Sequence, residues 1–269
     1  MDGRFAGTIA AVFGAARPPG IGRATALRLA REGAAVACLD HIRTTESDVD
    51  TTAVSRAALD AVVGEITAAG GTAIGVGADT TDEDSVRTAL AEAERALGPI
   101  GVGAYLGGGT GPGNGALLDL PLDEFDATVR LNLRGALVAM RELARCLPGG
   151  GAIVALSSHA VRSRPAGFGA FAAAKAGVES LVGSLAVELA PSRVRVNAVS
   201  PLGVGAGAVN PGLAATAGGP AGTTDWITRS IPLGRLQSAD ETASAVTYLL
   251  SEEASFITGQ TLSVTGGAW

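Results

Sequence analysis

The stretch Thr8-Ile-Ala-Ala-Val-Phe-Gly14-Ala-Ala-Arg-Pro-Pro-Gly20-Ile-Gly22 decides the fold. Its first part, Thr8–Phe13, is apolar and typical of a buried strand, and a helical pattern follows the loop. Glycines between a strand and a helix let the backbone pass close to a pyrophosphate, which the N–H groups and positive dipole of the helix N-terminus bind. A plain strand-to-helix turn is the alternative, but the place of the loop after the first strand favours a dinucleotide site.

The alternation of strands and helices continues along the chain. Further strands are predicted at Ala35–Leu39, Thr72–Val76, Val102–Leu106, Ala152–Leu156, Arg195–Val199 and Thr261–Val264, and helices near 21–32, 53–69, 82–97, 122–147, 168–190 and 240–251. Such alternation predicts an α/β fold: a single-domain, doubly wound parallel sheet of the Rossmann type, with about seven strands and helices on both faces.

Length and composition set the outer limits. A chain of 269 residues is long enough for one α/β domain over 1–269, and its composition marks no second one. With 47% apolar residues the chain is not expected to be disordered. A net charge of −6 without a Lys/Arg cluster argues against nucleic acid and anionic membrane surfaces as partners. No run of roughly 18 apolar residues is free of Gly, Pro or charge, so no membrane span is predicted.

The cysteines and the N-terminal segment predict a cytoplasmic protein. Cys38 and Cys146 are far apart in the sequence, which indicates buried thiols in a reducing compartment. The apolar run Phe5–Ala16 resembles a signal sequence, but Asp2 precedes it and the glycine loop overlaps it, so export is not expected.

Two long loops interrupt the alternation. The first, His41–Thr52, is polar and acidic. The second, Leu202–Pro220, is rich in Gly, Ala and Pro, and a short helix is expected after it around Thr224–Ser230. Because this second loop lies beyond the carboxyl end of a strand, the region of about 202–231 is interpreted as a substrate lid, with a disordered loop as the alternative.

Asp40 ends the second predicted strand. A carboxylate there accepts hydrogen bonds from the adenosine ribose hydroxyls and repels a 2′-phosphate, which favours NAD(H) over NADP(H). Arg17 in the glycine loop argues the other way, since it could reach a 2′-phosphate, and Asp40 could also be a solvated strand end. His41 has no partners at metal-ligand spacing, so no metal is predicted.

With these residues placed, the chain resembles the short-chain dehydrogenase/reductase superfamily over nearly its whole length. The matching pieces, in order, are the glycine loop, Asp40, Asp79, Leu131-Asn132-Leu133, Ser157-Ser158, Ala172-Ala-Ala-Lys175-Ala, Arg195–Pro201 and Thr258–Gly267. The resemblance implies a homodimer or homotetramer built on the helices around 122–147 and 168–190. It also implies a nicotinamide cofactor, with Gly14, Arg17, Gly20, Ile21, Gly22, Asp40, Asp79, Gly107, Lys175 and Val204 as the cofactor-binding residues.

The resemblance further implies a catalytic Tyr four residues before a Lys, a Ser that polarises the substrate oxygen, and an Asn that holds a water in a proton relay. Ser158, Lys175 and Asn132 match this set, but Phe171 stands at the Tyr position. A phenyl ring has no ionisable proton, so acid–base catalysis worth about 10²–10⁴-fold is expected to be lost. The divergent enoyl reductase branch places its Tyr seven residues before the Lys, where this chain has Phe168.

Other positions near the expected nicotinamide site also differ from the family pattern. The segment Leu106–Gly109 replaces Asn-Asn-Ala-Gly, Leu202 replaces a Gly, and Ala206 replaces the Thr that binds the carboxamide. The half of the site that would hold the adenine therefore fits the family, whereas the half that would hold the nicotinamide is altered.

Three side chains are candidates for the missing acid. Lys175 is the only Lys beside 19 Arg and is expected to contact ribose or substrate, or to act as the acid itself. His159 has a usual pKa near 6.5, which suits proton transfer at neutral pH. Strand alternation turns His159 away from its neighbour Ser158, so it could equally be a loop residue. Tyr105 is expected to pack in the core.

The expected substrate pocket is apolar and poor in charge, which favours a small apolar carbonyl or hydroxyl compound, for example a polyketide-like intermediate of specialised metabolism. Its side chains are Phe168, Phe171, Leu202 and Trp226. Three functions remain open at this point. The first is a non-redox enzyme for cyclisation, dehydration or isomerisation. The second is an NAD(H)-dependent ketone/alcohol oxidoreductase whose proton comes from Lys175, His159, water or the substrate, and the third is a catalytically silent subunit or nucleotide sensor.

Overall fold

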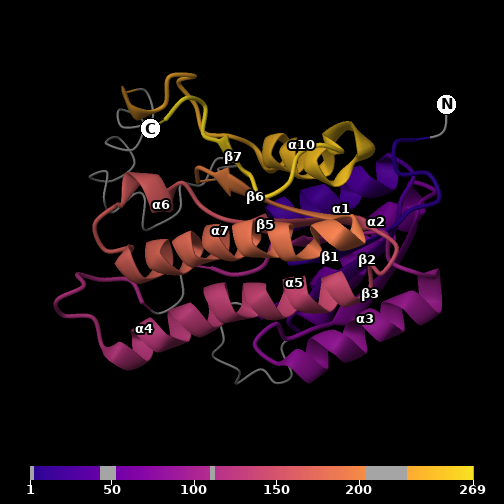
Figure 1. Ribbon diagram of the computed structural model, residues 1–269, viewed down its shortest axis with the longest axis horizontal. Coiled ribbons are helices and arrows are strands. Elements are labelled where there is room, and N and C mark those ends of the chain that lie inside the picture. Colours follow the sequence, from indigo (N-terminus) through magenta and orange to yellow (C-terminus); the bar gives the residue numbers. More distant parts are fainter. Residues whose placement is uncertain (1–2, 43–52, 110–112, 204–228, 269) are drawn as a thin grey trace.

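Seven short strands form one parallel sheet, as the alternation predicted (Figure 1). The computed structural model describes residues 3–42, 53–109, 113–203 and 229–268. The sheet has the order β3-β2-β1-β4-β5-β6-β7, which reverses direction between β1 and β4. Ligands of doubly wound sheets bind beyond the carboxyl ends of the strands at such a reversal. The strands are β1 (Ile9–Phe13), β2 (Ala35–Asp40), β3 (Thr72–Gly77), β4 (Val102–Tyr105), β5 (Gly151–Leu156), β6 (Val194–Pro201) and β7 (Thr261–Val264).

Helices cover both faces of the sheet. One face carries α1 (Ile21–Arg31), α2 (Arg56–Ala68) and α10 (Ala239–Leu250), and the other carries α3 (Glu83–Leu97), α5 (Gly135–Arg145) and α7 (Gly169–Leu189). Figure 1 shows α3, α5 and α7 side by side on this second face. The observed bounds lie within three residues of the predicted ones, apart from the region 122–147, and the short helix α6 (Ala160–Ser163) was not predicted.

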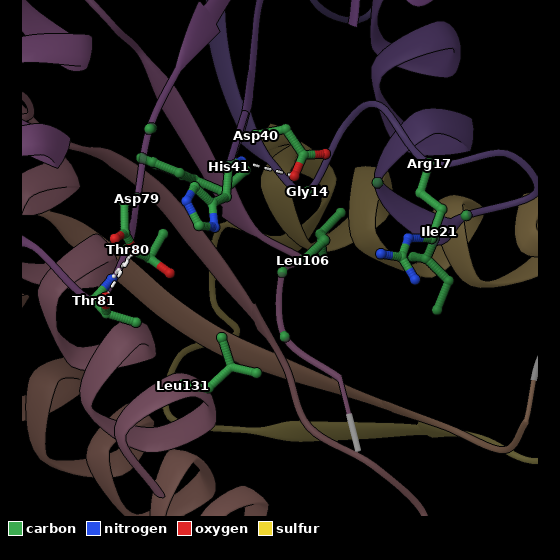
Figure 2. A pocket seen from close by; sticks show the side chains of 16 residues that line it. Gly14, Arg17, Ile21, Asp40, His41, Asp79, Thr80, Thr81, Leu106 and Leu131 are labelled. Carbon is green, nitrogen blue, oxygen red and sulfur yellow. Dashed lines mark hydrogen bonds between the residues drawn. The ribbon is translucent and has the colours of Figure 1, made fainter. Parts of the chain in front are cut away.

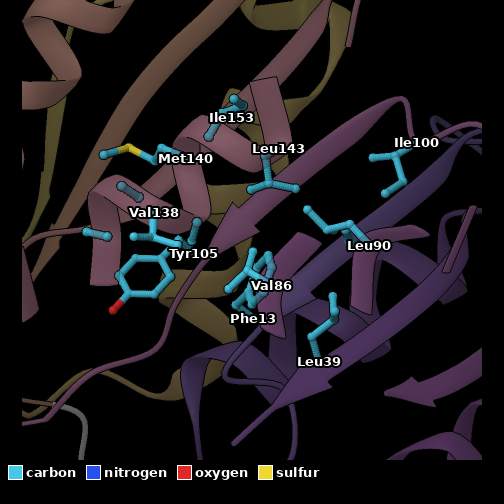
Figure 3. Close-up of a cluster of buried hydrophobic side chains, with 14 of the residues drawn as sticks. Phe13, Leu39, Val86, Leu90, Ile100, Tyr105, Val138, Met140, Leu143 and Ile153 are labelled. Carbon is cyan, nitrogen blue, oxygen red and sulfur yellow. The ribbon is translucent and has the colours of Figure 1, made fainter. Parts of the chain in front are cut away.

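The core consists of two apolar layers, one on each side of the sheet, because successive strand residues point to opposite faces. In β1, Ala11 and Phe13 pack toward α3 and α5, whereas Ala10 and Val12 pack toward α1 and α2. Tyr105 is fully buried in the first layer, as predicted (Figure 3).

The predicted helix at 122–147 consists of three segments. After α4 (Leu122–Val129) the chain forms a π-helix at Arg130–Arg134 and then continues into α5. A π-helix holds one extra residue in its turn, and such bulges occur frequently at functional sites. Here the π-helix buries Asn132 completely.

The helix α7 is the main apolar helix of the fold. By length and composition alone, Gly169–Ser192 would be able to cross a membrane, although no spanning segment was predicted; 39% of the most apolar window is buried. The helix packs against β5 and β6 and carries Lys175 and Glu179 toward the sheet edge, so its position in the core accounts for its apolar composition.

Both cysteines are thiols. Cys38 is buried and Cys146 is half-buried, and neither forms a disulfide. Burial raises the pKa of the Cys38 thiol to about 12 and that of Cys146 to about 11, so neither is a reactive thiolate at neutral pH.

Candidate dinucleotide cleft and active site

A cleft of about 170 Å³ lies at the carboxyl ends of β1, β2, β3 and β4. Figure 2 shows Arg17 and Ile21 on one side of this cleft and Asp79 and Thr80 on the other. Its lining includes Gly14, Arg17, Gly20, Ile21, Gly22, Asp40, His41, Asp79, Thr80, Thr81, Leu106, Gly107, Gly108 and Leu131. The cleft thus brings together the glycine loop, both predicted acids and Gly107.

The glycines of the loop allow close packing within the protein itself, whereas the sequence predicted that they let the backbone approach a pyrophosphate. A Cβ on Gly22 would lie 2.0 Å from the carbonyl oxygen of Gly14, and a Cβ on Gly14 would lie 2.9 Å from backbone atoms of Leu106. Gly14 also has a φ of +81°, which favours glycine. The glycines are therefore needed for the close approach of α1, β1 and the segment after β4, before any ligand is considered.

The N-terminus of α1 fits an anionic ligand. Its cap residue, Gly20, offers no side-chain hydrogen bond, and the first turn contains no acidic residue. The first N–H groups of a helix have no partner within the helix, and the helix dipole favours a negative charge beside them. A nicotinamide dinucleotide fits this cleft because its pyrophosphate would meet these groups beside Gly20, Ile21 and Gly22.

Asp40 ties the glycine loop to the end of β2. Its Oδ2 accepts a hydrogen bond from the Ala16 N–H at 2.8 Å, and its Oδ1 accepts one from the His41 N–H at 2.9 Å. The pKa of Asp40 is raised above its usual value, because the effect of burial outweighs that of these two N–H donors and the charge of Arg17, which lower it. Each carboxylate oxygen has a further lone pair that a ribose hydroxyl can use.

Asp79 forms the turn between β3 and α3. Its Oδ1 accepts hydrogen bonds from both the backbone N–H and the hydroxyl of Thr81 at 2.8 Å, while its own N–H donates to the hydroxyl of Ser85. The side chain therefore holds the rim of the cleft in place, as well as lining it.

Asn132 holds the glycine-rich segment that follows β4. Its Nδ2 donates to the carbonyl of Gly109 at 2.8 Å and to that of Thr128 at 3.1 Å, and its Oδ1 accepts from the Gly109 N–H at 3.2 Å. The side chain is thus occupied by the protein itself. These contacts give the side chain a positioning role, in addition to the water-holding role that the family resemblance implies for this Asn.

Lys175 lies on α7, next to the cleft rather than in its lining, and is fully buried. Its Nζ donates to the carbonyl of Leu156 at 2.9 Å and lies 5.7 Å from the centre of the Phe171 ring. A Cβ added to Gly108 would lie 3.4 Å from this nitrogen, so Lys175 sits directly behind a residue of the cleft. Burial lowers the pKa of Lys175 to about 8.

Phe171 lies one turn before Lys175 on α7, where the resemblance places a Tyr. The ring is half-buried and contacts the amine with its face, an arrangement that attracts an ammonium ion weakly. Phe168, half-buried, caps the N-terminus of α7. Neither ring brings a proton donor to the site.

Ser158 and His159 follow β5 at the same edge of the sheet. The Ser158 hydroxyl is partly exposed, and its oxygen accepts from the Ala160 N–H at 3.2 Å, which leaves its own proton for another partner. His159 is buried, and burial, with a smaller effect from Arg162, lowers its pKa. Leu202 is half-buried at the end of β6, while Val204, Ala206, Trp226 and most of the expected lid lie outside the described residues.

Several residues near the site were not found from the sequence. Thr80 and Thr81 line the cleft. Glu179 accepts a hydrogen bond from the buried Ser157 hydroxyl at 2.7 Å. The signal for Glu179 was its spacing, since residues four apart share one face of a helix, and Glu179 follows Lys175 by four. Among the described residues, no cluster of His, Cys, Asp and Glu could hold a metal ion.

The sheet order, the cleft at the reversal and the glycine loop define a Rossmann-type dinucleotide-binding protein. A family profile described as enoyl-(acyl carrier protein) reductase matches residues 14–268. The chain belongs to the short-chain dehydrogenase/reductase family.

Relatives and solved structures agree with this assignment. The L-rhamnose 1-dehydrogenase (NAD(P)(+)) of Azotobacter vinelandii is 36% identical over 95% of this chain and 94% of its own. The cis-4-hydroxycyclohexanecarboxylate dehydrogenase of Sinomonas cyclohexanicum is 35% identical over 99% of this chain and 98% of its own. A crystal structure of NAD+-bound xylitol dehydrogenase superposes with a TM-score of 0.86 at 28% identity, over 98% of this chain and 99% of that one.

Proposed function

We propose that the chain is an NAD(H)-dependent oxidoreductase that interconverts a hydroxyl and a carbonyl group on a small substrate, with Lys175 as its proton-transfer group. The observation that carries this proposal is the position of Lys175. Its amine lies directly behind Gly108 of the cleft, and a pKa of about 8 allows it to release and recover a proton near neutral pH. The two dehydrogenase relatives, named for hydroxyl-bearing substrates, support the reaction class.

The residues of the cleft support NAD(H) as the cofactor. The pyrophosphate would meet the first turn of α1, and Asp40 would accept from the ribose hydroxyls, while its carboxylate would disfavour the 2′-phosphate of NADP(H). Arg17 lines the same cleft and is the residue that would favour NADP(H) instead. When bound, the dinucleotide supplies or accepts the hydride.

The side chains of the protein would bind the substrate and transfer the proton. The free proton of the Ser158 hydroxyl would bond to the substrate oxygen, and the Lys175 ammonium would give up its proton as a hydroxyl forms. Phe168, Phe171 and Leu202 are half-buried and apolar, and they favour a small apolar carbonyl or hydroxyl compound of the kind found in specialised metabolism.

A second candidate is a non-redox reaction at the same site, such as a cyclisation, dehydration or isomerisation. Phe171 favours it, because its ring contacts Lys175 at the position where the family has an ionisable hydroxyl. A silent subunit or nucleotide sensor would bind the dinucleotide and convert no substrate.

Titration of the purified protein with NADH and with NADPH tests the proposal first. Micromolar binding of NADH, with much weaker binding of NADPH, would support the cofactor assignment. Turnover of hydroxyl compounds with NAD+ would then separate the oxidoreductase from the non-redox enzyme and the sensor. If neither dinucleotide binds, the oxidoreductase proposal is wrong.

The proposal includes a homodimer or homotetramer in the cytoplasm, in contact with neither nucleic acid nor membrane. The helices α4, α5 and α7 would form the subunit contact, and Val187 is an exposed apolar side chain on α7. Sedimentation equilibrium checks the assembly, and a monomer at micromolar concentration would rule out this part of the proposal.

A further inference from the structure

We propose that Lys175 captures small aldehydes and ketones covalently, as an imine. The neutral amine attacks the carbonyl carbon, and the C–N bond forms as the C=O π electrons move to oxygen. Proton transfer from nitrogen to oxygen gives a carbinolamine. Loss of the oxygen as water then leaves a C=N bond between the carbonyl carbon and Nζ, and no oxidant or reductant is consumed. Amines of lysine act as nucleophiles in this way when a desolvated site keeps them neutral.

The first support is the geometry around the amine. Nζ donates one hydrogen bond, to the carbonyl of Leu156 at 2.9 Å, and a neutral amine in that position keeps its lone pair for attack. On one side of Nζ lies Gly108, an exposed cleft residue without a side chain. A small carbonyl compound in the cleft would therefore have to pass this one glycine to reach the buried amine.

The second support is the absence of a counter-ion. In the part of the chain that the structure describes, Lys175 forms no ion pair. The charged groups nearby do not pair with the amine: Glu179 bonds to Ser157 and lies 3.5 Å from Arg162, and burial together with the charge of Arg162 lowers the pKa of His159. The groups packed on the amine from other elements are uncharged, namely Leu156 of β5, Gly108 after β4 and the Asn132 side chain. Among the described residues, the Leu156 carbonyl and the face of Phe171 are the groups that would stabilise a buried ammonium, and neither carries a charge.

These surroundings increase the share of reactive amine. Burial lowers the pKa of Lys175 to about 8, so about one amine in ten is neutral at pH 7, against fewer than one in a thousand for an ordinary lysine. A tyrosine hydroxyl at position 171 would provide an acidic partner there, and Phe171 cannot.

Imine formation extends the proposed function to chemistry that needs no hydride. Once its nitrogen takes up a proton, the imine becomes an iminium ion, which draws electrons from the neighbouring carbon more strongly than the parent ketone and so assists proton loss at that carbon and hence isomerisation or dehydration. The inference shares Lys175 with the proposed oxidoreductase but involves no dinucleotide, so its test is read separately from that of the oxidoreductase.

The experiment traps the imine by reduction. The full-length protein, without dinucleotide, is incubated at pH 7 with acetaldehyde and sodium cyanoborohydride, and peptides are mapped by mass spectrometry. The expected product is a secondary amine on Lys175, with a mass increase equal to acetaldehyde less one oxygen atom and a loss of tryptic cleavage after this residue. Because the chain has one Lys, the N-terminal amine is the only other primary amine and serves as an internal reference.

A matched variant sets the reference rate for an ordinary lysine. The double variant Lys175→Arg/Arg95→Lys moves the single ε-amine to an exposed position of α3, and its labelling at pH 7 is expected to be at least about tenfold slower than that of Lys175. Labelling of the wild-type protein at the N-terminus alone would overturn the proposal. Equal labelling rates for the two amines would overturn it as well, and the wild-type peptide map is decisive even if the variant does not fold.

Discussion

The Asn132 side chain is bonded to both backbone groups of Gly109, accepting from its N–H at 3.2 Å and donating to its carbonyl at 2.8 Å. Gly109 lies beyond the end of β4, where no neighbouring strand can pair with its backbone, and the buried Asn132 amide makes these two hydrogen bonds instead. This pair fixes the path of the glycine-rich segment over Lys175, and the shape of the cleft depends on it.

Replacing Asn132 by Ala should destabilise the fold. The change leaves the N–H and carbonyl of Gly109 without a partner and removes the bond to Thr128, which predicts a loss of about 1–3 kcal/mol in the free energy of unfolding. Urea denaturation measures it. The matched control is Asp126→Asn on the exposed side of α4, expected to change stability by less than about 0.5 kcal/mol. Similar values for the two variants would contradict the role of the Asn132–Gly109 pair.

Replacing Phe171 by Tyr should restore an acid to the site. If the cleft binds NAD(H) as proposed, the added hydroxyl should raise the rate of ketone reduction with NADH by about 10²–10⁴-fold. The measurement is NADH consumption with a panel of small ketones. Phe256→Tyr adds the same hydroxyl at a fully exposed position and should give no gain. If Phe171→Tyr gains nothing while NADH binds, the non-redox candidate is favoured.

Replacing Asp40 by Asn should weaken the preference for NADH. The amide keeps the size of the side chain but removes the charge that opposes a 2′-phosphate, so the ratio of the NADPH to the NADH dissociation constant should fall at least about tenfold. Isothermal titration calorimetry measures both constants. Asp60→Asn, at an exposed site paired with Arg56, should leave the ratio unchanged. An unchanged ratio in Asp40→Asn would show that Arg17 or another group sets the choice of cofactor.

Lys175 should make stability depend on alkaline pH. Its pKa is about 8 in the folded chain and near 10.5 when unfolded, so between these values the unfolded state binds more protons and stability rises with pH. Below pH 8 the buried charge costs ~3 kcal/mol relative to the neutral amine. Lys175→Met should therefore be more stable than wild type at pH 7, and this advantage should shrink as the pH approaches 10.5.

Chemical denaturation of both proteins at several pH values checks this difference. Tyr105, whose pKa burial raises to about 12 in the folded chain, also adds a pH dependence above about pH 9, but it is present in both proteins and cancels. A stability difference that stays constant from pH 7 to pH 10.5 would mean that Lys175 has an ordinary pKa.

The strands, the helices and the doubly wound parallel sheet followed from periodicity and the glycine loop, because both depend on local spacing, whereas the strand order came from the structure. Asp40 could be placed in the cleft from its position at a strand end, and Asp79 and Gly107 from the family resemblance. The π-helix at Arg130–Arg134 could not, because a shift of one residue in helical phase is hard to separate from an uninterrupted pattern over 122–147. The contacts of Asn132 and Glu179 depend on segments far apart in the sequence, and spacing alone does not determine them.

The direction in which the Asn132 side chain points depends on the extra residue in the π-helix turn. Each residue of an α-helix advances about 100° around the axis, so deleting one residue from Arg130–Arg134 would restore an uninterrupted helix and rotate α4 against α5 by that angle. Asn132 would then no longer face Gly109, although no functional side chain would have been replaced. Relatives that keep the Asn but differ in length here would lose the same contact. A sequence comparison of such chains must therefore consider the length of this segment as well as the identity of the residue.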